Sequence, residues 1–132
     1  MTTRPDPRPL PVPARFLAAA FAISGTVHLV RPATFASLMP GWVPAHTAVI
    51  QGSGVAELLC AAGLLLPRTR RAAGWASAAL LVAVFPGNLH MAADALAGDD
   101  TTYRAVALAR LPLQVPLVWI AVHAARSAPR RG

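Results

Sequence analysis

Hydrophobic residues gather in four long runs, which are separated by short segments rich in proline, glycine and charge. The runs cover residues 16–30, 47–66, 72–96 and 105–125. A helix needs about 20 apolar residues to cross a bilayer, and the last three runs reach that length. The first run reaches only about 22 Å at a helical rise of about 1.5 Å per residue, but Arg15 can snorkel toward the headgroups. The pattern predicts an all-α, four-transmembrane-helix bundle with helices over 15–30, 47–66, 72–96 and 105–125.

Composition supports a membrane protein and divides the chain into three parts. Hydrophobic residues make up 55% of the 132 positions and charged residues 13%, whereas soluble domains carry roughly 25% charged residues. Residues 1–14 hold five prolines and are predicted to form a disordered cytoplasmic tail. Residues 15–126 form the predicted membrane domain, and residues 127–132 a basic cytoplasmic tail. A cleaved signal peptide is the alternative for the first run, but little soluble chain would remain after cleavage.

The distribution of charge predicts the orientation. The first tail, the loop after the second run and the last tail together hold nine arginines and one acid, Asp6. The two other loops hold Arg31 and Arg104 against Asp99 and Asp100. Positive charge collects on the cytoplasmic side of membrane proteins. Both termini are therefore predicted to be cytoplasmic, in a multi-pass protein of the bacterial cytoplasmic membrane.

Several classes of function are disfavoured by the residues present. The net charge of +7 is spread over separate loops rather than one basic face, so nucleic acid is not an expected partner. The single cysteine, Cys60, lies in an apolar run and forms no redox pair or zinc site. The sequence contains no nucleotide loop, nucleophile elbow, paired catalytic carboxylates or metal signature. We therefore expect no catalytic residues and no metal site.

Polar residues inside the apolar runs are the candidate functional residues, because ionisable groups in a bilayer are costly. Residues three or four positions from Glu57 are small, as on a helix face that another helix approaches closely. By position along their runs, the polar groups fall at mid-membrane or in its outer half. They predict a polar pocket that opens outward. The predicted ligand-binding or buried polar cluster consists of His28, Ser53, Glu57, Asn88, His90, Arg110 and Gln114.

Two structural roles compete with ligand binding. Glu57 and Arg110 are oppositely charged, and pairing would let both stay ionised, so we predict that they lie within direct or one-water reach. Pro86, Pro112 and Pro116 each remove a helical hydrogen bond. The freed carbonyls need donors, which Asn88, Arg110 or Gln114 can supply. For His28 and His90 a hydrogen bond between helices is favoured over metal ligation. The polar cluster therefore either binds a ligand or donates hydrogen bonds to the carbonyls that the prolines leave free.

Five short motifs in order resemble the DoxX-like small membrane proteins of bacteria. They are GTVHLVRP at 25–32, MPGWVP at 39–44, SGVAEL at 53–58, VFPGNLHM at 84–91 and RLPLQ at 110–114. The resemblance implies a four-helix membrane bundle, usually of undetermined activity, and marks His28, Glu57, Asn88, Arg110 and Gln114 as the family's polar positions. Some relatives are linked to quinone-coupled sulfur oxidation or to membrane complexes that respond to oxidative stress. The chain lacks a redox cysteine pair of its own.

These observations predict an accessory membrane protein whose outward pocket binds a small amphipathic molecule, such as a quinone headgroup, or docks a membrane or periplasmic redox partner. A quinone would leave its tail in lipid, while its carbonyl oxygens accept hydrogen bonds from Arg110, His28 or Asn88. The first alternative is a purely structural or scaffolding protein. The second is a small-solute transporter or exporter, for which a homo-oligomer would supply the path.

Overall fold

The computed structural model describes residues 8–130, which form five helices and no strand. The helices are α1 (Val12–Val30), α2 (Ala33–Ala36), α3 (His46–Leu65), α4 (Arg70–Ala97) and α5 (Thr101–Ser127). The four long ones are apolar and long enough to cross a membrane. The predicted all-α fold with four such helices is confirmed, as expected of a multi-pass membrane protein.

Local signals at two helix starts explain where the predicted bounds differ. Helix α1 begins at Val12 rather than at residue 15, with Pro13 in its first turn, where proline costs no hydrogen bond. Helix α5 begins at Thr101 rather than at residue 105, because the Asp100 side chain accepts a hydrogen bond from the Tyr103 backbone N–H at 2.9 Å. Part of the predicted tail is therefore helical. Its residues 1–7, and residues 131 and 132 of the last tail, lie outside the described residues.

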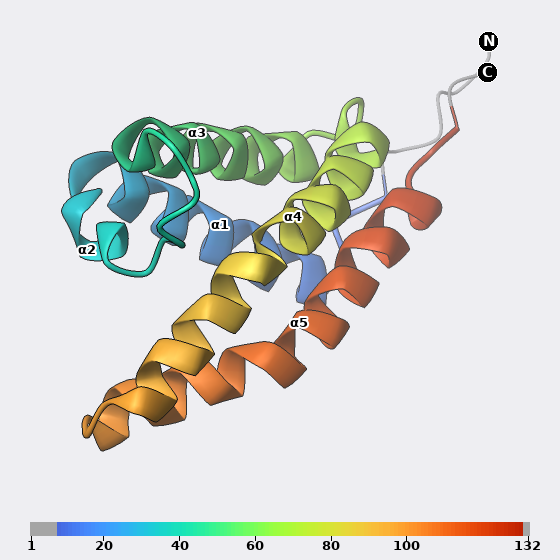
Figure 1. Ribbon diagram of the computed structural model, residues 1–132. Coiled ribbons are helices and arrows are strands. Elements are labelled where there is room, and N and C mark those ends of the chain that lie inside the picture. Colours follow the sequence, from blue (N-terminus) through green and yellow to red (C-terminus); the bar gives the residue numbers. More distant parts are fainter. Residues whose placement is uncertain (1–7, 131–132) are drawn as a thin grey trace, which may run out of the picture.

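The helices are arranged as two pairs that meet at one end and diverge at the other (Figure 1). Helix α1 packs along α3, and α4 packs along α5. Where the pairs meet, the start of α1, the end of α3, the start of α4 and the end of α5 share one core, which includes Leu17, Leu64, Ala73 and Ala124. At the other end a separate cluster of Met91, Ala95 and Ala107 joins α4 and α5, and Leu38 of the loop after α1 packs against it. The space between the diverging pairs positions the site.

Glycines set the separation of the two helices within each pair. A Cβ built on Gly54 would lie 2.8 Å from the carbonyl oxygen of Gly25, and one built on Gly25 would lie 2.7 Å from that of Gly54. A Cβ on Gly74 would meet the backbone nitrogen of Ala125 at 2.7 Å. Such contacts allow no side chain. The small residues around Glu57 therefore form a close helix contact, as the sequence predicted.

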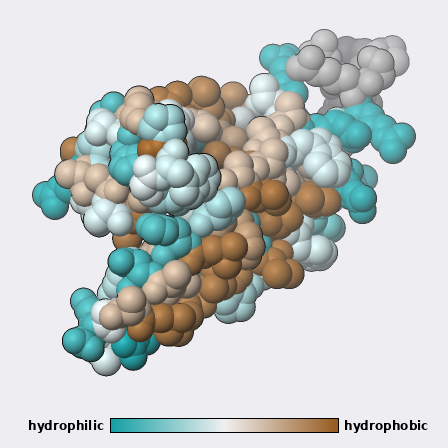
Figure 2. All heavy atoms as spheres, viewed as in Figure 1, coloured by the Kyte–Doolittle hydropathy of each residue, from teal (hydrophilic) through white to brown (hydrophobic). Residues whose placement is uncertain are grey.

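The outer surface is suited to lipid. Large apolar side chains point away from the bundle, for example Phe16 at 72% exposure and Val115 at 72%. Hydrophobic residues cover the middle of the α4–α5 pair, with hydrophilic residues at both of its ends (Figure 2). An aqueous surface would not carry so much apolar area. The distribution fits helices that cross a bilayer.

Arg70 ties the segment before α1 to the start of α4. Its side chain is buried at 5% exposure, and it donates from Nε to the Leu64 carbonyl at 3.1 Å and from Nη1 to the Arg8 carbonyl at 2.7 Å. The next arginine, Arg71, is exposed. One guanidinium thus joins three segments at the end of the bundle where the two helix pairs meet, which we call the closed end.

We expect Arg70→Ala to lower the free energy of unfolding by about 3 kcal/mol or more, because it removes two hydrogen bonds made by a charged group, and each contributes about 1.5–3 kcal/mol. The matched control Arg71→Ala should stay within about 0.5 kcal/mol of the unmutated protein. Thermal and denaturant unfolding in detergent measures both changes. Equal losses in the two variants would show that the Arg8 and Leu64 contacts do not stabilise the closed end.

Candidate functional site

A pocket of about 270 Å³ lies between the two helix pairs. All four long helices and the segment from residue 31 to 45 contribute to its lining. Most lining side chains are apolar, and five are polar. These five are His28, Ser53, Glu57, Asn88 and Arg110, all members of the cluster predicted from the sequence.

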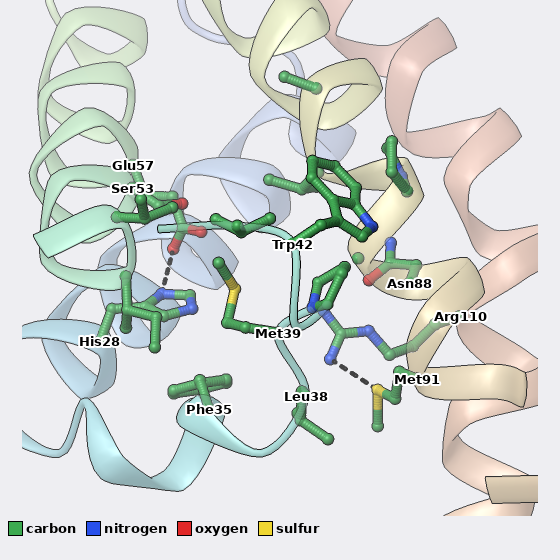
Figure 3. A pocket seen from close by; sticks show the side chains of 18 residues that line it. His28, Phe35, Leu38, Met39, Trp42, Ser53, Glu57, Asn88, Met91 and Arg110 are labelled. Atoms are coloured by element: carbon green, nitrogen blue, oxygen red, sulfur yellow. Dashed lines mark hydrogen bonds and ion pairs between the residues drawn. The ribbon is translucent and has the colours of Figure 1, made fainter. Parts of the chain in front are cut away.

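One wall of the pocket is formed by α1 and α3 (Figure 3). Glu57 is buried, and its Oε2 lies 3.4 Å from Nδ1 of His28. The same Nδ1 lies 3.4 Å from the hydroxyl oxygen of Ser24. The close contact of Gly25 with Gly54 brings the two helices near enough for this pair. The contact has ion-pair distance but not hydrogen-bond geometry, and Oε2 has no hydrogen-bond partner among the described residues.

The opposite wall is formed by α4 and α5 (Figure 3). Asn88 is buried at 9% exposure, and its side chain forms no hydrogen bond within residues 8–130. Arg110 lines the pocket and donates from Nη1 to the sulfur of Met91 at 3.8 Å. A thioether is a weak acceptor. The wall therefore presents an amide and a cation whose hydrogen-bonding capacity is largely unused.

Glu57 and Arg110 form no direct ion pair among the described residues, so the direct form of the prediction is wrong, while contact through one water stays a prediction. In the described part of the chain the carboxylate pairs with His28, and the guanidinium contacts Met91. The physical reason is the arrangement of the helices. Helix α3 packs on α1 and α4, whereas α5 packs mainly on α4, so the two charges stand on different walls of one pocket.

Two members of the predicted cluster do not line the pocket. Gln114 is buried and donates from Nε2 to the Leu81 carbonyl of α4. Leu81 directly precedes Val82, the residue whose carbonyl Pro86 leaves without its helical donor. Gln114 therefore supports α4 beside its proline, but it bonds the Leu81 carbonyl and not the Val82 carbonyl that Pro86 frees, so the repair alternative stays a prediction. His90 is partly exposed on α4 and is not among the lining residues.

The sequence did not predict that the loop after α1 would cover the pocket. The loop contains the short helix α2, and Phe35, Leu38 and Met39 line the pocket together with Trp42. The ring centroid of Phe35 lies 4.1 Å from that of His28. The signal was the spacing of Phe35, Leu38 and Met39 at i, i+3 and i+4, which is the spacing of one helix face.

The conformation of this loop is fixed at its end. Ala45 adopts a φ of 50° just before α3, and this left-handed conformation costs a non-glycine residue roughly 1–2 kcal/mol. His46 Nε2 lies 3.2 Å from the carbonyl of Pro40. The chain thus turns sharply at residue 45, which places the loop across the pocket before α3 begins.

The chemistry of the pocket is that of recognition by hydrogen bonds within an apolar cavity. It offers a carboxylate, an imidazole, a hydroxyl, an amide and a guanidinium. No group of three or more His, Cys, Asp or Glu side chains within residues 8–130 has a geometry that could hold a metal ion. Polar groups at fixed positions in an apolar cavity are typical of sites for small organic molecules.

A family model described as a domain of unknown function, DUF8561, matches residues 17–125. This range includes α3 and α4 in full, most of α1 and α5, and every polar residue of the pocket. Neither the comparison with curated proteins nor that with solved structures gives a match. The resemblance to DoxX-like proteins stays a prediction.

Proposed function

The chain belongs to the DUF8561 family, and we propose that it binds the headgroup of a small amphipathic molecule in the pocket between its two helix pairs. One observation carries the proposal. Side chains from both walls, Glu57 and Asn88 among them, face one cavity without hydrogen-bond partners in the described part of the chain. Buried polar groups are normally paired. Groups that only stabilised the bundle would be expected to pair with one another, as Gln114 does with the Leu81 carbonyl.

The position of the pocket favours a ligand from the membrane. The pocket lies where the helix pairs diverge, and most of its lining is apolar. A molecule with an apolar tail can place its headgroup against the polar side chains while the tail remains between the pairs or in lipid. A quinone headgroup has suitable dimensions and carries carbonyl oxygens that accept from Arg110 or Asn88. The protein then serves as an accessory subunit of a membrane oxidoreductase rather than as an enzyme.

The distribution of charge supports a location of this pocket on the outer side of the bacterial cytoplasmic membrane. The loop between α3 and α4 carries Arg68, Arg70 and Arg71, and it lies at the closed end of the bundle. The pocket and the loop over residues 31–45 lie toward the opposite end. By the positive-inside rule the closed end is cytoplasmic, as are both termini. The pocket therefore takes up its ligand from the outer half of the bilayer.

Binding of a short-chain quinone to the purified protein tests this function. We expect decyl-quinone to bind in detergent, and Asn88→Leu to weaken binding by about tenfold or more while the helix content and melting temperature stay close to those of the unmutated protein. Gln114→Leu is the matched control. It removes a buried polar side chain outside the pocket, and should lower the melting temperature without changing the dissociation constant.

Isothermal titration calorimetry gives the dissociation constants, and mass spectrometry of the gently extracted protein identifies amphipathic molecules that co-purify. If no amphipathic molecule binds or co-purifies and Asn88→Leu unfolds the protein, the polar residues only stabilise the helix bundle. The scaffolding function would then replace the proposal.

A further inference from the structure

The carboxylate of Glu57 lacks a hydrogen-bond donor. Its side chain is 9% exposed, and Oε2 is fully buried without a hydrogen-bond partner in the described part of the chain. A buried carboxylate in this state is costly, because it has lost water and gained no replacement. The residue also lines the pocket. A molecule in the pocket is therefore in a position to supply the missing donor.

His28 does not fill this role. Its Nδ1 lies 3.4 Å from Oε2 of Glu57 and also 3.4 Å from the Ser24 hydroxyl, so one N–H would be divided between two long contacts. The imidazole is packed against Phe35, with 4.1 Å between the ring centroids. This packing limits any rotation of the ring toward the carboxylate. Glu57 can therefore take a donor from a ligand without losing a hydrogen bond.

On the other wall, the guanidinium of Arg110 needs a hydrogen-bond acceptor. Arg110 is always protonated and offers five N–H donors. Among the described residues its one hydrogen bond goes to the Met91 sulfur, at 3.8 Å. The guanidinium is therefore available to an oxygen acceptor on a ligand. The Glu57 carboxylate on one wall therefore needs a hydrogen-bond donor, and the Arg110 guanidinium on the other wall needs an acceptor.

The charges of the residues that line the pocket restrict the net charge of a ligand that it can bind. The pocket holds one carboxylate and one guanidinium, and protonation of His28 would add a second positive charge. A ligand with a net positive charge would gain at Glu57 and be repelled at Arg110. A neutral or zwitterionic headgroup can interact favourably with Glu57 on one wall and with Arg110 on the other.

We infer that the pocket selects an uncharged or zwitterionic headgroup that donates a hydrogen bond to Glu57 and accepts one from Arg110. A quinone in its oxidised form offers acceptors alone, so it leaves Glu57 without a donor. A quinol offers hydroxyls, and an aminophospholipid offers an ammonium beside a phosphate. These two membrane sources share the required chemistry. The inference rests on the proposed function and specifies which headgroups the same pocket prefers.

Matched pairs of probes, in which one member has hydrogen-bond donors on its headgroup and the other has none, test the inference. A decyl-hydroquinone is compared with its dimethyl ether, and a short-chain phosphatidylethanolamine with the phosphatidylcholine of equal chain length, which has no N–H. Titration calorimetry of the unmutated protein in one detergent gives each affinity. We expect the donating member of at least one pair to bind about tenfold more tightly or better, as for a hydrogen bond to a charged group. The pair that shows the preference identifies the source.

Glu57→Gln provides a second measurement that a structural role would not change. Its amide can donate as well as accept, so the preference for the donating probe should fall from about tenfold to about twofold or less. The ratio within each pair in the unmutated protein is informative even if this variant does not fold. Equal affinities within both pairs, with binding still lost in Asn88→Leu, would overturn the inference and leave the proposed function standing. Failure of all four probes, with decyl-quinone still bound, would also overturn the inference alone, whereas failure of decyl-quinone as well would overturn both.

Discussion

Gly54→Ala should destabilise the protein by about 1–3 kcal/mol, although it adds only one methyl group. The new Cβ would lie 2.8 Å from the Gly25 carbonyl oxygen and 2.8 Å from the Cβ of His28, both far inside van der Waals contact. Because one neighbour is backbone, α1 and α3 must move apart, which is the usual cost of overpacking a close contact. The same movement separates His28 from Glu57, so we expect ligand binding to weaken as well.

Gly52→Ala is the control, two residues earlier in the same helix. A Cβ there meets nothing within 4 Å. Alanine has the better helix propensity, by about 1 kcal/mol, so this variant should match or exceed the unmutated protein in stability. Denaturant unfolding in detergent, followed by helical circular dichroism, compares the two variants. Similar stabilities for Gly52→Ala and Gly54→Ala would mean that α1 and α3 do not pack through Gly25 and Gly54.

His28→Leu and Glu57→Leu are expected to be energetically coupled. Loss of His28 leaves Glu57 buried beside an apolar side chain, and removal of one partner from a buried pair typically costs about 3–5 kcal/mol. Replacement of both by leucine removes the unpaired charge, so the double variant should lose less than the sum of the single losses. We expect an interaction free energy of about 1 kcal/mol or more.

The control cycle pairs Glu57→Leu with Arg110→Leu. These residues line the same pocket from different walls but form no ion pair in the described chain. Their effects on the free energy of unfolding should add to within about 0.5 kcal/mol. The same unfolding measurements serve both cycles. A coupling of Glu57 to Arg110 that exceeds its coupling to His28 would show that Arg110, and not His28, is the partner of Glu57.

The candidate site was predicted in part because a polar residue in an apolar run is conspicuous. His28, Ser53, Glu57, Asn88 and Arg110 were all predicted, and they share one pocket. Gln114 was identified by the same rule, but it supports the backbone of α4. Polarity at a given depth thus indicates that a side chain needs a partner. Whether the partner is a backbone carbonyl, a second side chain or a ligand depends on its neighbours in space.

Two features of the pocket depend on contacts that no local pattern expresses. The pairing of Glu57 with His28 follows from the contact of Gly25 with Gly54, which joins helices separated by a loop. The covering role of the loop over residues 31–45 was not predicted. Its apolar residues face the pocket, and Phe35 packs on His28. Charge complementarity alone favoured Arg110 as the partner of Glu57. The sequence shows which residues are charged but not which helices are in contact.

The sequence by itself determined the four long apolar helices, because burying a backbone in lipid requires continuous runs of apolar residues with internal hydrogen bonds. It also determined which side chains needed partners, because each polar group in such a run is costly. The tertiary structure alone decided that the helices form two diverging pairs, with α1 on α3 and α4 on α5. That arrangement depends on close contacts at Gly25, Gly54 and Gly74, which fix distances between segments far apart in the chain. The tertiary structure likewise decided that Glu57 and Arg110 stand on different walls of one pocket and form no direct ion pair in the described chain.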